Sequence, residues 1–506
     1  KLELRFNCRS GAAGDGTLRM TRPGRAAGYS ARCPPRRLLA GTRWKLEDLM
    51  SQLLIKSGKC VIGGDVVTTD LLVDEGKIVA IGSGVAKTAR TVIEAGGRLV
   101  LPGGVDVHVH LPWPKGKHIS SDDFNNGTLA AAFGGVTSVI DFVIPEEEES
   151  LQAALKRKLE DARVNAWVDF SAHLNIRGEI EAKLREVEGL VKEGFPSFKV
   201  FMAYEGFRVA DEDILRVMKA IGDAGGVMTV HAENGILADH LTQELLAQGK
   251  RALSYYPQAR PALCELESIH RLLAYNQRMG IRLHFHHVST GGGAEMIGEA
   301  RRQGLPVTGE TCPHYLLFND LDYTQDPQFA SYLVCAPAIQ SQADQDGLWL
   351  RLADGSLSVL ATDHCPFTKT QKEANLDDFS QTPGGLGGVE TRLPLIFTEG
   401  VLAGRLTLEK FTEVWASGPA RAFGLYPQKG TIAVGSDADL VIFDPQRRAT
   451  LRAFDLHSQT DCTPYEGREV AGLPLTTILR GQIVVDEGRL AVETPGGELV
   501  RRYLNG

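Results

Sequence analysis

The feature that most constrains the fold is an alternation of apolar, strand-like runs with amphipathic helices, repeated eight times between residues 105 and 363. Eight such repeats predict a (β/α)8 barrel, in which parallel strands form an inner ring and helices an outer one. A doubly wound open sheet is the alternative, but the glycine clusters 291–293 and 384–388 lack the strand–G-x-G-x-x-G–helix context that it would need. The predicted strands are Val105–His110, Thr137–Phe142, Trp167–Leu174, Ser197–Met202, Val227–Ala232, Arg282–Val288, Pro306–Thr311 and Leu357–Asp363.

Two similar turns flank this central region, one near each end of the chain. Asp74-Glu75-Gly76 separates two apolar runs, and Asp486-Glu487-Gly488 does the same near the C-terminus. Turns of this composition favour tight β-hairpins. We therefore expect a small β-sandwich domain formed by residues 50–102 and 428–495, with the barrel spanning residues 103–427. Chance recurrence of a common turn is the alternative.

Residues 1–49 differ in composition from the rest of the chain. They contain 11 Lys+Arg and 4 Asp+Glu, a balance of +7, so the formal charge of −8 leaves −15 for residues 50–506. They are rich in Arg, Gly and Pro and show no sustained periodicity. This pattern predicts a disordered or non-native leader before Met50, and an organelle transit peptide is the alternative.

The composition of the main body excludes several classes of function. Its acidic balance offers no electrostatic footprint for nucleic acid or for an anionic membrane. No stretch approaches the roughly 18 consecutive apolar residues that cross a bilayer. The eight cysteines are scattered without a C-x-x-C pair, which favours free thiols in a reducing compartment, so we expect a cytoplasmic protein.

Side chains that bind metals gather at the ends of the predicted strands, where barrel enzymes carry their chemistry. Alternation along the first strand puts His108 and His110 on one face, about 7 Å apart. Three later strands end at His231, His287 and Asp363. Imidazole and carboxylate are typical ligands of Zn²⁺ and similar divalent ions. In the run 284–287 only His287 shares the parity of its apolar neighbours, so we expect one ligand there and structural or outer roles for the other histidines.

Lys199 is unusual because it lies inside the apolar run Phe198–Met202, where a bare ammonium group would be costly to bury. One interpretation is that its amine reaches solvent from the strand end or pairs with a carboxylate. The other is chemical. An amine with a lowered pKa can add carbon dioxide, and the resulting carbamate has two oxygens that can bridge two metal ions.

These motifs resemble those of the cyclic amidohydrolases of the dihydropyrimidinase/hydantoinase group, within the amidohydrolase superfamily. The resemblance extends from about Met50 to the C-terminal hairpin. The matching phrases are Gly103–His110, Asp122–Phe124, Gly134–Thr137, Phe198–Tyr204, His231–Asn234, His287–Thr290, Glu310–Tyr315 and Thr362–Phe367.

The resemblance implies hydrolysis of the cyclic amide bond of a dihydropyrimidine or 5-substituted hydantoin to the N-carbamoyl amino acid. It implies two divalent ions, with zinc expected, and a homotetramer. His108, His110 and Asp363 would bind one ion, His231 and His287 the other, and carboxylated Lys199 would bridge them. Tyr204 would hydrogen-bond the developing oxyanion, and Asp363 would carry the proton to the leaving ring nitrogen.

The chain departs from the family pattern in two loops, named here loop A (residues 335–340) and loop B (residues 382–385). Loop A reads Cys-Ala-Pro-Ala-Ile-Gln where the family commonly has Ser-Pro-Pro, an apolar residue and Arg. Loop B has Gly384 where an Asn often follows the Pro. Because the family holds its ring largely through backbone groups, Ala336 and Gly384 are still expected to bind substrate, with a shifted preference.

Two alternative functions remain at this point. One is the opening of a related ring, as in allantoinase. Dihydroorotate is less favoured, since dihydroorotase-like enzymes usually carry an Arg soon after the H-x-H and this chain has Leu111–Pro114. The other is a non-catalytic protein on the same scaffold, like the collapsin response mediator proteins. Those have lost metal ligands, whereas this chain retains all of them.

Overall fold

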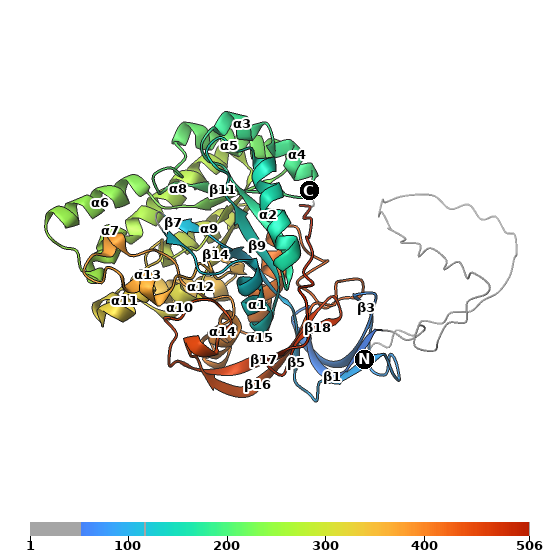
Figure 1. Cartoon of the computed structure of the whole chain (residues 1–506). Helices are drawn as coiled ribbons and strands as arrows, with labels where there is room; N and C mark the ends of the chain where they lie inside the picture. Colours follow the sequence, from blue (N-terminus) through green and yellow to red (C-terminus); the bar gives the residue numbers. More distant parts are fainter. Residues whose placement is uncertain (1–51, 116–117, 505–506) are drawn as a thin grey trace, which may run out of the picture. The chain divides into compact units, whose positions relative to one another are not determined.

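The computed structural model describes residues 52–115 and 118–504 (Figure 1), so the predicted leader, residues 1–49, lies outside the described residues. At the centre is an eight-stranded parallel sheet in the order β15-β14-β13-β12-β11-β10-β9-β6. Neighbouring strands follow one another along the chain, and the sheet closes almost completely. The predicted (β/α)8 barrel is therefore confirmed.

All eight predicted barrel strands are present. Five of them end earlier than predicted, three by one residue and two by three residues. The two larger differences are at β13 and β15, where the left-handed residues His287 (φ 36°) and Asp363 (φ 49°) lie beyond the strand ends. The strands are β6 (Gly104–Val109), β9 (Val136–Val143), β10 (Asp169–Asn175), β11 (Ser197–Phe201), β12 (Val227–His231), β13 (Arg282–Phe285), β14 (Val307–Thr311) and β15 (Val359–Leu360).

Helices between the strands cover the outside of the barrel. In α5 the apolar side chains Ile214, Val217, Met218 and Ile221 recur at helical spacing and are buried, while Asp211, Glu212 and Asp213 oppose the dipole in the first turn. The longer helices are α1 (Phe124–Phe133), α2 (Leu151–Asn165), α5 (Asp211–Asp223), α6 (Gly235–Ala247), α8 (Ala262–Met279), α9 (Gly291–Arg302) and α12 (Gln342–Ala353). The shorter ones are α3 (Ile180–Leu184), α4 (Val187–Lys192), α7 (Tyr256–Ala259), α10 (Pro313–Leu317), α11 (Pro327–Leu333), α13 (Lys369–Glu373), α14 (Arg392–Ile396), α15 (Leu408–Thr412) and α16 (Gly418–Ala422).

The seam between β6 and β15, the first and last barrel strands, is closed largely by polar side chains. Asp106 on β6 accepts hydrogen bonds from the hydroxyl (2.7 Å) and the N–H (3.2 Å) of Thr362. The buried guanidinium of Arg392 donates to main-chain carbonyls on both strands. The backbone of His364 exchanges hydrogen bonds of 2.9 and 3.3 Å with the end of β6. These contacts hold the H-x-H strand beside the strand that leads to Asp363.

A second, nine-stranded sheet is built from both ends of the described chain, which confirms the small β domain expected from the two hairpins. The two halves join where β5 pairs antiparallel with β16, Leu101 opposite Val441. Both hairpin turns use left-handed residues, at Glu75, Gly76, Glu487 and Gly488. Its strands are β1 (Leu53–Ile62), β2 (Asp65–Asp74), β3 (Lys77–Ile81), β4 (Thr91–Glu94), β5 (Leu99–Pro102), β16 (Leu440–Thr450), β17 (Glu469–Leu479), β18 (Gln482–Asp486) and β19 (Arg489–Leu490). The division at residues 50–102, 103–427 and 428–495 stays a prediction.

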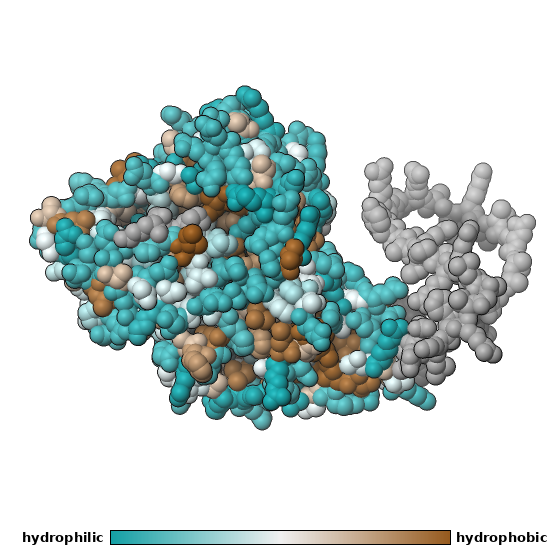
Figure 2. Space-filling model, viewed as in Figure 1, coloured by the Kyte–Doolittle hydropathy of each residue, from teal (hydrophilic) through white to brown (hydrophobic). Residues whose placement is uncertain are grey.

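The C-terminal segment after β19 returns to the barrel. Val500 donates its N–H to the carbonyl of Phe170 on β10 (2.8 Å), and the buried Arg502 donates to Ser171 and Ser197 (2.8 and 2.7 Å). Figure 2 shows that most of the visible face is hydrophilic and that apolar residues gather over the small sheet. Within the described ranges, no helix has the length and apolar character needed to cross a membrane.

Candidate metal centre and substrate pocket

Every residue predicted for the site lines one cavity at the carboxyl end of the barrel. Aromatic and small residues complete the wall. The lining consists of His108, His110, Trp113, Lys199, Phe201, Tyr204, His231, His287, Ala336, Asp363, Cys365, Gly384 and Gly385. The structure thus brings together, from seven stretches of the chain, the side chains that the sequence pattern placed at separate strand ends.

The first group of metal-ligand side chains is His108, His110 and Asp363. The carboxylate oxygen Oδ1 of Asp363 lies 3.0 Å from Nε2 of His108 and 3.0 Å from Nε2 of His110. All three residues are buried. Burial alone would raise the pKa of Asp363, but the adjacent histidines hold it well below its ordinary value. An ionised carboxylate and two imidazole nitrogens this close together can bind one divalent cation.

The second group is His231 and His287. Nδ1 of His231 and Nε2 of His287 face each other at 2.9 Å, as two ligands of one ion would. The ring centroids of His108 and His287 are 5.2 Å apart, so the two groups are adjacent. The donor set can therefore hold two neighbouring cations.

Lys199 projects from β11 into the same cavity and is almost fully buried. Its Nζ lies 4.9 and 5.1 Å from the ring centroids of Phe201 and Phe142. Burial lowers the pKa of the amine to about 7, so a large fraction is uncharged at neutral pH. Among the described residues Lys199 forms no direct salt bridge, but the nearby carboxylates of Glu310 and Asp363 partly oppose the effect of burial on its pKa. An uncharged amine is the form that can add carbon dioxide.

Backbone strain is concentrated at the site. Among the described barrel residues, the non-glycine residues with positive φ are Tyr204 (69°), His287 (36°) and Asp363 (49°). Strained conformations of this kind persist only where the surrounding structure enforces them, and they cluster at functional sites. The conformation at His287 also explains how it reaches the cavity, because the residue lies beyond the end of β13 and no longer follows strand alternation.

Glu310 on β14 has a role that the sequence did not reveal. Its carboxylate accepts hydrogen bonds from Nδ1 of His108, from Nε2 of His284 (3.0 Å) and from Nδ1 of His286 (2.8 Å), and also from the N–H of His287 (3.2 Å). His284 and His286 therefore lie in the barrel interior as partners of this carboxylate, whereas alternation along the strand predicts that only His287 points inward. By holding Nδ1 of His108, Glu310 directs Nε2 toward Asp363.

Glu233 supports the second group in a similar way. It accepts a hydrogen bond from Nε2 of His231 (3.0 Å), which leaves Nδ1 facing His287. Arg260 pairs with the same carboxylate, and its guanidinium lies 5.4 Å from the ring centroid of Tyr204. Burial would raise the pKa of Glu233, but Arg260 and His231 lower it to about 2. Glu233 belongs to the sequence motif His231–Asn234, whereas its partner Arg260 lies in none of the motifs named above.

Ala336 and Gly384 line the cavity without a polar side chain of their own. Their N–H and C=O groups form no hydrogen bond with any other residue that the structure describes. They therefore present backbone donors and acceptors to the cavity, beside the two groups of metal ligands.

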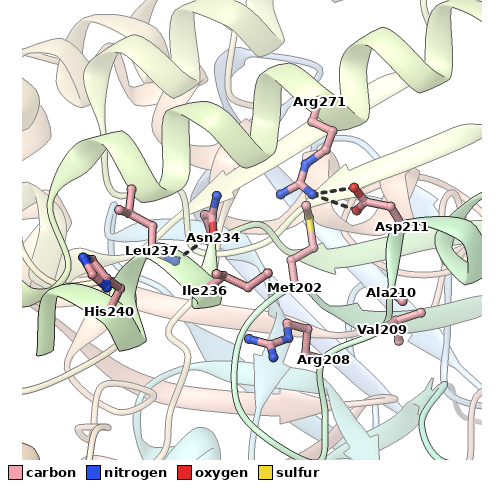
Figure 3. A pocket seen from close by; sticks show the side chains of 10 residues that line it. All are labelled: Met202, Arg208, Val209, Ala210, Asp211, Asn234, Ile236, Leu237, His240 and Arg271. Atoms are coloured by element: carbon pink, nitrogen blue, oxygen red, sulfur yellow. Dashed lines mark hydrogen bonds and ion pairs between the residues drawn. The ribbon is translucent and has the colours of Figure 1, made fainter. Parts of the chain in front are cut away.

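A larger cavity, about 690 Å³ in volume, lies outside the barrel mouth between the starts of α5 and α6 and the side of α8 (Figure 3). Figure 3 shows two pairings among its polar side chains: Arg271 donates to both oxygens of Asp211 (2.7 and 2.8 Å), and Asn234 caps α6 by accepting from the N–H of Leu237 (3.0 Å). We therefore place the candidate site in the smaller cavity, where the metal ligands converge.

Comparison with known proteins agrees with this geometry. A model of the amidohydrolase family matches residues 99–484. A D-hydantoinase from Geobacillus stearothermophilus is 40% identical over 454 residues, which covers 89% of this chain and 96% of that protein. A D-phenylhydantoinase from Escherichia coli O1:K1 / APEC is 36% identical over 455 residues, with 89% and 98% covered.

Solved structures show the same similarity. The dihydropyrimidinase from Brevibacillus agri superposes with a TM-score of 0.87 at 38% identity and covers 90% of this chain and 99% of its own. The L-hydantoinase (dihydropyrimidinase) from Arthrobacter aurescens gives a TM-score of 0.84 at 33% identity, with 90% and 100% covered. The two converging groups of metal ligands and these matches over nearly the whole described chain establish that it belongs to the amidohydrolase family, as a metal-dependent cyclic amidohydrolase of the hydantoinase and dihydropyrimidinase group.

Proposed function

We propose that this enzyme hydrolyses the cyclic amide bond of a 5-substituted hydantoin or a dihydropyrimidine and releases the N-carbamoyl amino acid. One observation carries the proposal: a single cavity gathers both groups of metal ligands, Tyr204, and the backbone of Ala336 and Gly384. The names of the relatives, D-hydantoinase and dihydropyrimidinase, support the same class of substrate.

We propose two zinc ions as the cofactor, since imidazole, carboxylate and carbamate oxygen are all donors that zinc accepts. His108, His110 and Asp363 would hold one ion, and His231 and His287 the other. The face-to-face approach of Nδ1 and Nε2 in the second pair, at 2.9 Å, supports a shared cation. Lys199, as the N6-carboxylysine, would bridge the two. When bound, the ions lower the pKa of water and so supply a nucleophile at neutral pH.

The protein's own residues then divide the remaining work. Burial raises the pKa of the Tyr204 hydroxyl well above its ordinary value, so it stays protonated and can donate to the oxyanion that develops on the ring carbonyl. Asp363 is held ionised, so its carboxylate can accept the proton of the attacking water and deliver it to the leaving ring nitrogen. Ala336 and Gly384 orient the ring through their backbone groups.

The aromatic wall of the cavity supports a substrate with an apolar substituent. Trp113 lies 5.9 Å from Phe201 and 5.8 Å from Phe207, measured between ring centroids. Such a surface suits a flat apolar group. Arginine does not occur among the described residues that line the cavity, so a substrate carboxylate such as that of dihydroorotate has no guanidinium partner there.

The test combines metal analysis of the purified protein with turnover of dihydrouracil, hydantoin, phenylhydantoin, allantoin and dihydroorotate. We expect two zinc ions per chain and turnover of the first three rings. His287→Ala should lose metal and activity, whereas His270→Ala, which changes an exposed histidine on α8, should retain both. Allantoin as the preferred ring would replace the proposed substrate class. Absence of turnover by the metal-loaded enzyme on every ring would reject the proposal.

We also propose a homotetramer and a cytoplasmic location, supported by the family resemblance of the sequence. Light scattering of the purified enzyme at several concentrations tests the oligomeric state, and fractionation of the source cells tests the location. A stable monomer or dimer with full activity would contradict the first proposal.

A further inference from the structure

A buried lysine, Lys372 of α13, joins the two loops that present backbone groups to the cavity. Its Nζ donates to the carbonyl of Val334 (2.8 Å), immediately before loop A, and to the carbonyl of Pro383 (2.9 Å) in loop B. The side chain is only 2% exposed. One ammonium group therefore contacts the chain two residues before Ala336 and one residue before Gly384.

The carbonyls on either side of Ala336 are also held by the protein. The carbonyl of Val334 accepts a second hydrogen bond, from the N–H of Gly385 (2.9 Å). The hydroxyl of Tyr256 donates to the carbonyl of Cys335 (2.7 Å), and the hydroxyl of Tyr315 donates to the carbonyl of Pro337 (2.8 Å). The scaffold thus fixes the flanking peptide groups, while the backbone of Ala336 and Gly384 faces the cavity.

Loops A and B lie so close together that the distance between them can affect how a ligand binds. A Cβ atom built on Gly384 would lie 3.8 Å from backbone atoms of Cys335, which is ordinary van der Waals contact. Because neither Ala336 nor Gly384 has a side chain that can rotate to meet a ligand, the distance between the two backbones decides which donors and acceptors a bound ring can reach.

The helix that carries Lys372 is itself anchored to α11, the helix that precedes loop A. Glu373 accepts hydrogen bonds from Gln328 (2.5 Å) and from the hydroxyl of Tyr332, both on α11. The last residue of α11 is followed directly by Val334. A capping box between Thr368 and Gln371 fixes the start of α13. The ammonium therefore occupies a defined position relative to both loops.

We propose that Lys372 is a positioning residue that sets the separation of Ala336 and Gly384 and so determines which cyclic ureide the site accepts. The proposal rests on the proposed function, since it assumes that these backbones bind the ring. An apolar side chain would bury at lower cost than an ammonium if packing were the whole requirement. A lysine instead supplies several directed N–H groups, which can hold carbonyls from two separate segments at once.

The test compares Lys372→Met with Lys369→Met, a change at a half-exposed lysine on the same helix. Both enzymes are loaded with zinc and assayed with the best ring found for the wild type and with its five- or six-membered counterpart. Misplacement of binding groups by about 1 Å costs about 10²-fold. We expect Lys372→Met to raise KM about 10- to 100-fold, with metal content unchanged and kcat altered much less. The preference between five- and six-membered rings should also shift.

Each outcome is decisive. Unaltered KM and ring preference in Lys372→Met would overturn the proposal, and so would a fall in kcat that parallels loss of zinc. If Lys372→Met does not fold, Lys372→Gln, which retains one donor group, is judged by the same criteria. If neither variant folds, Lys372 is a folding residue and the proposal fails. Failure of the proposed function is separate, because it would appear as a wild-type enzyme that turns over none of the rings.

Discussion

Replacing Glu310 with glutamine removes a charge from the centre of the metal site while keeping its shape. In the structure Oε1 alone accepts from Nδ1 of His108, from Nδ1 of His286 (2.8 Å) and from the N–H of His287 (3.2 Å). A glutamine carbonyl can keep these contacts, but as neutral hydrogen bonds. We therefore expect Glu310→Gln to fold, but to hold His108, His286 and His287 in place less strongly.

The magnitude follows from the two kinds of hydrogen bond. Bonds to a charged group contribute about 1.5–3 kcal/mol and neutral ones about 0.5–1.5 kcal/mol. The change thus costs about 1 kcal/mol per bond, or about 3 kcal/mol of stability for the three bonds of Oε1. Loss of a carboxylate partner of a metal-binding histidine typically lowers metal affinity about 10- to 100-fold, which is the effect we expect for zinc.

The assay is competition for zinc between the apoenzyme and a chelator of known affinity, with urea unfolding of the same apoenzyme. Glu299→Gln is the matched control, because Glu299 is exposed on α9 and its side chain bonds, among the described residues, only to the nearby Arg302 and Gln303. It should change neither quantity. If Glu310→Gln binds zinc as tightly as the wild type and unfolds at the same urea concentration, Glu310 does not organise the metal-ligand histidines and the reasoning is refuted.

Three further substitutions test the roles assigned to individual side chains. Lys199→Ala should lose metal and activity, and short carboxylic acids should partly restore both by supplying a bridging carboxylate; two metals per chain with full turnover would exclude a bridging role. Tyr204→Phe should lower kcat about 10²–10³-fold with KM and metal content nearly unchanged, and an unaltered kcat would remove the oxyanion role. Asp363→Asn should lower kcat by at least about 10²-fold even at full metal occupancy, and turnover at the wild-type rate in the metal-loaded variant would exclude proton transfer by this residue.

The barrel could be predicted, and the residues that line its cavity could be named as candidate metal ligands, because their signals are local. Each strand shows its own apolar period, and a histidine or aspartate at its end needs no knowledge of the neighbouring strand. His287 shows where this reasoning stops. Parity along β13 predicts that His287 alone points inward, yet His284 and His286 are the residues of the strand that contact Glu310 inside the barrel. His287 reaches the cavity because of the left-handed backbone beyond the strand end, which alternation cannot describe.

Glu310 and Lys372 could not be assigned for a different reason. Their roles depend on partners brought together by the fold: His108 lies 202 positions from Glu310, and Lys372 joins carbonyls that lie 38 and 11 positions away. A buried lysine whose acceptors are main-chain carbonyls leaves no trace in the pattern of side chains. Such residues are found only after the chain is folded.

The seam between β6 and β15 has a consequence for how the enzyme is made. Thr362 and Asp106, which meet across it, are 256 positions apart, so the first three-ligand set stays incomplete until the last strand has been synthesised and has docked. A nascent chain that already carries His108 and His110 still lacks Asp363. A metal ion bound by all three ligands would favour the closed ring by mass action. Metal acquisition is therefore expected to mark the end of barrel assembly.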